Sequence, residues 1–99
     1  MDQKQVLSLA KEYAAAVREV VDATAVFLYG SHAKGTATED SDIDIAIVVK
    51  EISGDYLDTM SALWRLTRSV NQNIEPVLLT LEDETSGFLS TVRKTGIAV

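Results

Sequence analysis

Residues 41–49 read SDIDIAIVV, and this run limits the folds open to the chain more than any other segment. Its apolar residues alternate, so that Ile43, Ile45 and Ile47 share one face of an extended strand. The opposite face begins with Asp42 and Asp44. We therefore predict a buried strand that carries two carboxylates, side by side, at its first end.

The segments around this strand show the periodicities of alternating helices and strands. Apolar residues recur every three or four positions in two long segments, and β-branched residues dominate two short ones. The expected elements, in chain order, are a helix over 3–22, a strand over 24–29, a loop or short helix to about residue 40, the strand at 41–49, a helix over 55–70 and a strand over 74–79.

A last helix is expected near the end of the sequence. Thr80 could cap it, with Glu82, Asp83 and Glu84 in its first turn, where the helix dipole favours anions. Gly96 would end this helix and leave a short tail over 97–99.

This order of elements predicts one small sheet covered by helices, in an α/β or α+β arrangement of two layers. A chain of 99 residues is long enough for one hydrophobic core and too short for a second. We therefore expect a single domain over 1–99.

Composition excludes several classes of function. The chain has no cysteine, so it forms neither disulfides nor thiolate metal sites, and any metal must be held by oxygen or by His32. We take His32 as a surface residue and leave it out of the metal site. A formal charge of −6 argues against general binding of nucleic acid. Without a segment suited to a membrane span or a signal peptide, the expected location is the cytoplasm.

The two aspartates predict a site for a divalent cation. Residues i and i+2 of a strand point to the same side, so Asp42 and Asp44 lie close enough to repel each other. Binding of Mg²⁺ removes this penalty, because the ion takes oxygen ligands and typically joins carboxylates to the phosphate oxygens of a substrate. The alternative, that both aspartates face solvent in a loop, conflicts with the apolar residues on either side.

A third acid, Glu75, opens the next expected strand in the run NIEPVLL. Pro76 holds Glu75 extended and removes one backbone N–H from the sheet, so this strand end is expected at an edge or at the mouth of a cleft. If the two strands are neighbours, Glu75 joins Asp42 and Asp44, and three carboxylates could hold two metal ions. Alternatively, Glu75 is a solvated charge at a strand edge.

Gly30 and Ser31 follow the first expected strand directly. A glycine at this point lets the backbone turn sharply and approach a ligand. Ser31 then opens the next short segment, where its N–H and hydroxyl would point at an anion such as a phosphate. Residues 34–39 could instead form a plain hairpin connection.

Taken together, GSHAKG, SDIDI and IEP resemble the nucleotidyltransferase superfamily related to DNA polymerase β, above all its minimal nucleotidyltransferase (MNT) domains. The resemblance covers nearly the whole chain. It implies a small mixed sheet with helices packed on one side, and transfer of a nucleoside monophosphate from a Mg²⁺-bound triphosphate, with ATP the expected donor. One departure is mild, since the third acid of the family is often aspartate.

The resemblance also assigns roles to residues. It implies that Asp42, Asp44 and Glu75 bind two Mg²⁺ ions, and that Glu75 helps to deprotonate the acceptor hydroxyl. By the same resemblance, Gly30 and Ser31 hold the triphosphate.

Finally, the resemblance implies a biological setting, because MNT proteins are often encoded beside a small helical HEPN protein as toxin and antitoxin. The expected activity is adenylylation of a hydroxyl on such a toxin. Two alternatives stay open: an antitoxin that neutralises its partner by occlusion without catalysis, and a transferase that acts on a small molecule.

Overall fold

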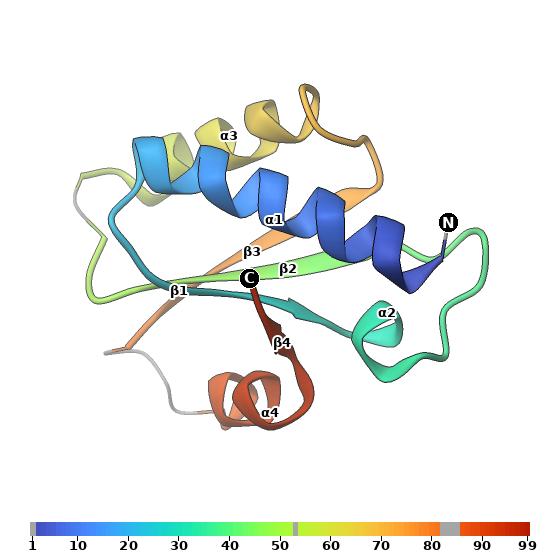
Figure 1. Cartoon of the computed structure of the whole chain (residues 1–99). Coiled ribbons are helices and arrows are strands. Elements are labelled where there is room, and N and C mark those ends of the chain that lie inside the picture. The colour runs from blue at the N-terminus through green and yellow to red at the C-terminus, as the bar shows by residue number, and fades with distance from the viewer. Residues whose placement is uncertain (1, 53, 82–85) are drawn as a thin grey trace.

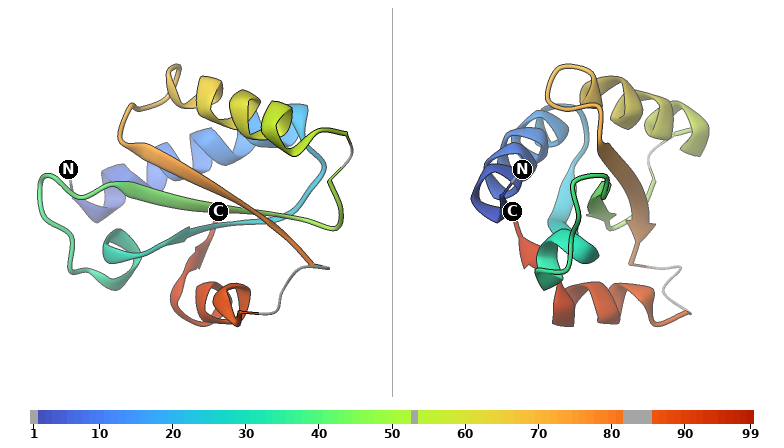
Figure 2. Two further views of the ribbon diagram at one scale, coloured as in Figure 1. Left: turned by 180° about the vertical axis from the view of Figure 1, so that it is seen from behind. Right: turned by 90° about the vertical axis from the view of Figure 1, so that its right-hand side faces the viewer.

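In the computed structural model, which describes residues 2–52, 54–81 and 86–99, two long helices cover one face of a four-stranded sheet (Figure 1). The elements, in chain order, are α1 (Gln3–Val20), β1 (Ala23–Tyr29), α2 (Ser31–Lys34), β2 (Ile43–Val49), α3 (Tyr56–Thr67), β3 (Ile74–Thr80), α4 (Phe88–Thr95) and β4 (Ile97–Ala98). Helices α1 and α3 lie side by side above the sheet, and α4 crosses below it (Figure 2). This small mixed α+β architecture confirms the expected fold class, although the short last helix packs on the opposite face from the two long ones.

The strands are ordered β3-β2-β1-β4 across the sheet. Strand β1 pairs antiparallel with both β2 and β4, whereas β2 and β3 run parallel because α3 connects them as a crossover. Strand β3 is therefore an edge strand, as Pro76 predicted.

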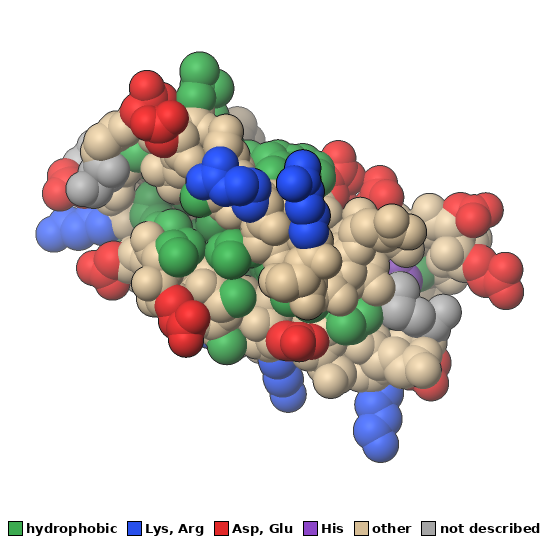
Figure 3. Space-filling view, turned by 90° about the horizontal axis from the view of Figure 1, so that it is seen from above, with side chains coloured by type: hydrophobic (Ala, Val, Ile, Leu, Met, Phe, Trp, Pro, Cys, Tyr) green, Lys and Arg blue, Asp and Glu red, His purple; other side chains and the backbone are tan. Residues whose placement is uncertain are grey.

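Helix α1 begins with a capping box in which Asp2 accepts from the Gln5 backbone N–H and the Gln5 side chain accepts from the Asp2 N–H. Its inward stripe is fully buried on the sheet and consists of Val6, Ala10, Tyr13, Ala14 and Val17. Figure 3 views the layer of α1 and α3 from above, where hydrophobic side chains also reach the surface.

Strand β2 is buried on both faces after its first residues. Ile43, Ile45 and Ile47 belong to the main core beneath α1 and α3. On the other face, Ala46 and Val48 are also fully buried, because α4 covers that side of the sheet. The charges at the start of β2 thus lie where the cover provided by α4 ends.

The last helix differs from the expectation. Thr80 is the final residue of β3, paired with Val49, and therefore does not cap a helix. Helix α4 begins instead at Phe88 after Gly87, which takes a left-handed conformation with φ 78°. Glu82, Asp83 and Glu84 lie outside the described residues. Gly96 does end the helix, but the tail beyond it forms β4 and completes the sheet.

The other boundaries lie close to those predicted from the sequence. The strand expected at 41–49 begins two residues later, so that Asp42 precedes β2, while the Ile43 N–H still donates to the Asn73 carbonyl at 2.9 Å. Across the residues that the structure describes, no helix combines the length and apolar character needed to cross a bilayer.

One buried hydrogen bond joins the two long helices. The Tyr13 hydroxyl donates to the Leu63 carbonyl over 2.7 Å. Burial raises the pKa of this hydroxyl well above its ordinary value, so Tyr13 stays neutral and keeps its proton for the bond.

We expect Tyr13→Phe to lower the free energy of unfolding by about 0.5–1.5 kcal/mol, because it removes this hydrogen bond while leaving the ring in place. Urea unfolding at neutral pH measures the change. Tyr56→Phe is the matched control, since Tyr56 is exposed. Equal stability of the two variants would show that the bond contributes nothing.

Candidate active site

The parallel pairing of β2 with β3 sets Asp44 directly opposite Glu75. Residues in register on neighbouring strands point to the same face, and the preceding pair, Ile43 and Ile74, points into the main core. Asp44 and Glu75 therefore project together from the other face, the one that α4 partly covers. The sequence placed both acids at strand starts, and the structure brings them together.

Asp42 joins this pair from the segment just before β2. Hydrogen bonding with the Asp42 carboxyl is the first cause that raises the pKa of Glu75, followed by burial and by the charges of Asp42 and Asp44. The side chains of Asp42, Asp44 and Glu75 are here called the acid cluster. When ionised, these carboxylates repel one another.

Asp44 is the most enclosed member of the acid cluster. Burial raises its pKa, the charge of Asp42 raises it further, and His32 lowers it in part. Asp44 is half-buried, whereas Asp42 and Glu75 are exposed, so the cluster is open to solvent on one side.

Gly30 packs against Asp44 so closely that no side chain fits between them. A Cβ atom added to Gly30 would collide with Asp44 Oδ2. Its backbone angles, φ 76° and ψ −153°, also lie in a region that only glycine adopts readily. The glycine that the sequence singled out is therefore required by the acid cluster itself.

Ser31 begins the single turn of α2, beside the acid cluster. The turn closes through hydrogen bonds from Lys34 N–H to the Gly30 carbonyl, at 3.1 Å, and from Thr36 N–H to the Ser31 carbonyl, at 3.0 Å. The backbone N–H groups at the start of such a turn have no partner within the helix and can bind an anion.

His32 is not the surface residue that we expected. It is buried, its Nε2 lies 3.3 Å from the Ser41 carbonyl oxygen, and its own carbonyl accepts from Gln3 Nε2 at 3.1 Å. These contacts fix α2 between the start of α1 and the segment that leads into β2. Sequence reasoning missed this role because a lone histidine has no periodic pattern.

Tyr29 is a second residue that the sequence analysis overlooked. It pairs with Asp44 in the sheet, and its ring meets that of Phe88 edge-on at 5.5 Å between centroids. Burial, Asp44 and Glu75 together raise the Tyr29 pKa to about 12. Its position directly before Gly30 is the signal that could have found it.

The donor set of the acid cluster fits a hard divalent cation such as Mg²⁺, because all its donor atoms are carboxylate oxygens and a cation would offset the negative charges that lie together there. Among the described residues, however, no group of three or more His, Asp or Glu side chains is already arranged to hold a metal ion. Binding of one ion by all three carboxylates would therefore require their side chains to rearrange.

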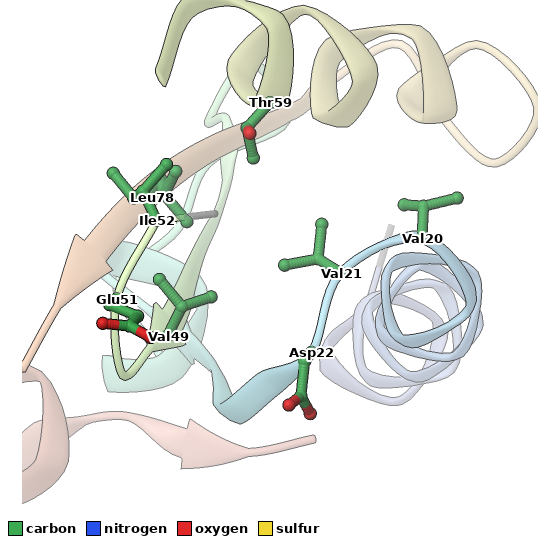
Figure 4. A pocket seen from close by; sticks show the side chains of 8 residues that line it. All are labelled: Val20, Val21, Asp22, Val49, Glu51, Ile52, Thr59 and Leu78. Carbon is green, nitrogen blue, oxygen red and sulfur yellow. The ribbon is translucent and has the colours of Figure 1, made fainter. Parts of the chain in front are cut away.

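A separate apolar pocket lies at the opposite end of the sheet, where β2 ends (Figure 4). Its walls come from Val20, Val21, Val49, Ile52, Thr59 and Leu78. Asp22 and Glu51 are its only acids, and the Asp22 carboxylate points away from the cavity. This pocket therefore lacks the chemistry that the acid cluster offers.

Comparison with known proteins shows the family to which the chain belongs. The model of the family "Polymerase beta, Nucleotidyltransferase" matches residues 5–99. This chain therefore belongs to the polymerase β nucleotidyltransferase family. A search of curated proteins found no match.

Several solved structures share the fold. One, from Sulfolobus solfataricus and described as a candidate nucleotidyltransferase, has a TM-score of 0.67 and 27% identity over 97% of this chain and 80% of its own. A toxin–antitoxin complex with AMP-PNP has a TM-score of 0.60 and 19% identity, over 99% of this chain and 72% of its own. A variant of the toxin–antitoxin pair MntA-HpeT has a TM-score of 0.57 and 17% identity, over the same two shares. These neighbours show that the chain has the fold of the polymerase β nucleotidyltransferase family.

We expect Gly30→Ala to lower the free energy of unfolding by about 1–3 kcal/mol, because the new methyl group meets Asp44 and the backbone angles suit glycine alone. Thermal unfolding measures the loss. Gly35→Ala is the matched control: Gly35 also has φ 76°, but nothing lies within 4 Å of its added Cβ, so it should cost only about 1 kcal/mol. Equal losses at the two positions would contradict close packing of Gly30 on Asp44.

We expect Asp42→Asn to lower the pKa of both Asp44 and Glu75, because it removes a negative charge that raises each of them. NMR titration of the carboxyl groups measures the shift. Raised carboxyl pKa values make wild type gain stability as pH falls through them, and the variant should lose part of this gain. Asp22→Asn, at the far end of β1, should leave both titrations unchanged. Unaltered titrations in Asp42→Asn would refute the coupling.

Proposed function

We propose that this protein is a Mg²⁺-dependent nucleotidyltransferase that transfers AMP from ATP to a hydroxyl group of a protein acceptor. The observation that carries this proposal is the register of β2 and β3, which sets Asp44 opposite Glu75 on the face where Gly30 makes room for the carboxylates. Membership of the polymerase β nucleotidyltransferase family and the toxin–antitoxin neighbours support it.

Each site residue has a proposed role. Asp42 and Asp44 would hold Mg²⁺, which when bound neutralises charge on the triphosphate and on the leaving pyrophosphate. Gly30 and Ser31 would hold the triphosphate through their backbone and the Ser31 hydroxyl. Glu75 would accept the proton of the attacking hydroxyl and complete a site for a second ion.

The proposed acceptor is a toxin of the HEPN type, and the protein would act as its antitoxin in the cytoplasm. Two neighbours of the same fold are toxin–antitoxin complexes, one of them with AMP-PNP. The other carries a variant in which two aspartates, two positions apart, are replaced by glutamate, which is the spacing of Asp42 and Asp44. This resemblance favours an adenine nucleotide and a protein partner here.

A second candidate function is neutralisation by occlusion, in which the protein covers its partner without modifying it. Within the part of the chain that the structure describes, no three acidic or histidine side chains are already arranged to hold a metal ion, which favours this reading. The catalytic proposal requires that ion binding rearranges Glu75.

We expect Mg²⁺ or Mn²⁺ to raise the melting temperature of wild type, because an ion that binds only the folded state stabilises it, by about 2.7 kcal/mol at one hundred times its dissociation constant. The double variant Asp42→Asn with Asp44→Asn should lose this response, while Asp22→Asn should keep it. The ion-dependent rise is the quantity compared, because removal of the charges alone also stabilises the fold. A response that survives in the double variant would place the ion elsewhere.

The decisive experiment co-expresses the protein with the product of the neighbouring gene, the proposed toxin, and incubates the complex with Mg-ATP. We expect mass spectrometry to show an added adenylate on the toxin, and expect Asp44→Asn to abolish it. If instead no adduct forms, and wild type and the Asp42→Ala with Asp44→Ala variant neutralise the toxin equally, occlusion is the correct function.

A further inference from the structure

Helix α3 exposes large apolar side chains on the side that faces away from the sheet. Leu57 is 70% exposed and Trp64 is 44% exposed, although Leu63 on the inner side is fully buried. Leu57, Ser61 and Trp64 recur at helical spacing, so they share one outer face, and with Met60, Arg65 and Arg68 they line a broad groove. A helix that only covers a sheet carries a polar outer face, so these side chains indicate an interaction surface.

The charges on the same helix are separated by sign. Asp55 and Asp58 stand at its first turn, and Arg65 and Arg68 stand at its end. The helix dipole favours this order of charges, but it does not explain why Leu57 and Trp64 are exposed on the same helix. Asp58 and Arg65 are seven residues apart, about 10.5 Å along the axis, which is too far for them to pair within one helix.

We propose that α3 binds α3 of a second copy of this chain in an antiparallel arrangement, across a twofold axis near Ser61. In this arrangement Trp64 of one copy packs on Leu57 of the other, and Asp58 of one copy meets Arg65 of the other. Each contact occurs twice, as twofold symmetry requires. Ser61, which is small and exposed, lets the helices approach closely at their crossing.

Charge complementarity favours a second copy over an unrelated partner. A chain with a net charge of −6 repels its own copies over most orientations. On α3, however, acidic and basic ends are arranged so that reversing the helix sets each against its opposite. The acid cluster projects from the face of the sheet that α4 partly covers, away from α3, so both copies would keep it open (Figure 1).

Sedimentation equilibrium of the purified full chain, from micromolar to submillimolar concentration, tests the proposal. We expect wild type to pass from the mass of one chain to that of two. Trp64→Ala and Leu57→Ser should each weaken the dimer at least about tenfold, because truncation of a central aromatic or aliphatic anchor has an effect of this size. A wild type that stays monomeric throughout, or a dimer that both variants leave unchanged, would overturn the proposal.

A charge exchange gives a sharper test of the antiparallel geometry. Asp58→Arg alone and Arg65→Asp alone should each be monomeric, because each sets like charges together at both contacts. An equimolar mixture of the two variants should form a heterodimer, in which every contact between positions 58 and 65 again joins opposite charges.

The control for the charge exchange is Lys11→Glu, on the exposed side of α1, which changes the net charge as Arg65→Asp does and should leave the dimer intact. Circular dichroism verifies that every variant is folded. Failure of the mixture to associate would rule out this arrangement, and the outcome is independent of whether the acid cluster transfers a nucleotide.

Discussion

Parallel pairing between β2 and β3 determines which acids meet, and the remaining features of the site depend on it. The register sets Asp44 opposite Glu75, and the same register turns Ile43 and Ile74 into the core. A slip of one residue would exchange these two faces, turning the carboxylates into the main core and the isoleucines out of it. Burial of the apolar face therefore fixes the position of the acids, because any change of register would also remove the isoleucines from the core.

The acid cluster gathers negative charge at one point of the sheet. Burial and the charge of Asp42 raise the pKa of Asp44, and hydrogen bonding with Asp42, burial and the charges of Asp42 and Asp44 raise the pKa of Glu75. Gly30 is confined to a backbone conformation that few residues tolerate, beside the carboxylate of Asp44. Local strain and repulsion of this kind are typical of sites that are completed by a ligand, because binding of a cation relieves the repulsion.

The two faces of the sheet have different roles: one forms the main core, and the other carries the acid cluster. The face under α1 and α3 forms the main hydrophobic core, and α1 and α3 are joined by the bond from Tyr13 to Leu63. The other face is covered by the short helix α4. This helix does not reach the first residues of β2 and β3, where the acid cluster lies. Tyr29 and Phe88 meet where this cover ends, so the aromatic contact links α4 to the strand that leads into Gly30.

Much of the fold could be predicted because its signals are local. Apolar spacing indicated the two long helices, and alternation in 41–49 indicated β2 with its two aspartates. The sequence also marked Pro76 as an edge residue. The predicted start of the last helix was wrong because Thr80 is of a residue type that often caps helices. In the structure, Thr80 belongs to β3 because it pairs with Val49, which lies far from it in the sequence.

By itself, the sequence determined the core positions of α1 and β2 and which acids stand near strand starts, since the spacing of apolar residues is a property of neighbours along the chain. Only the tertiary structure decided that Asp44 faces Glu75, that Gly30 lies against Asp44, and that His32 is buried beneath the segment before β2. These facts depend on pairing between strands far apart in the chain. Such pairing is chosen by the packing of the whole core, and no local pattern records it.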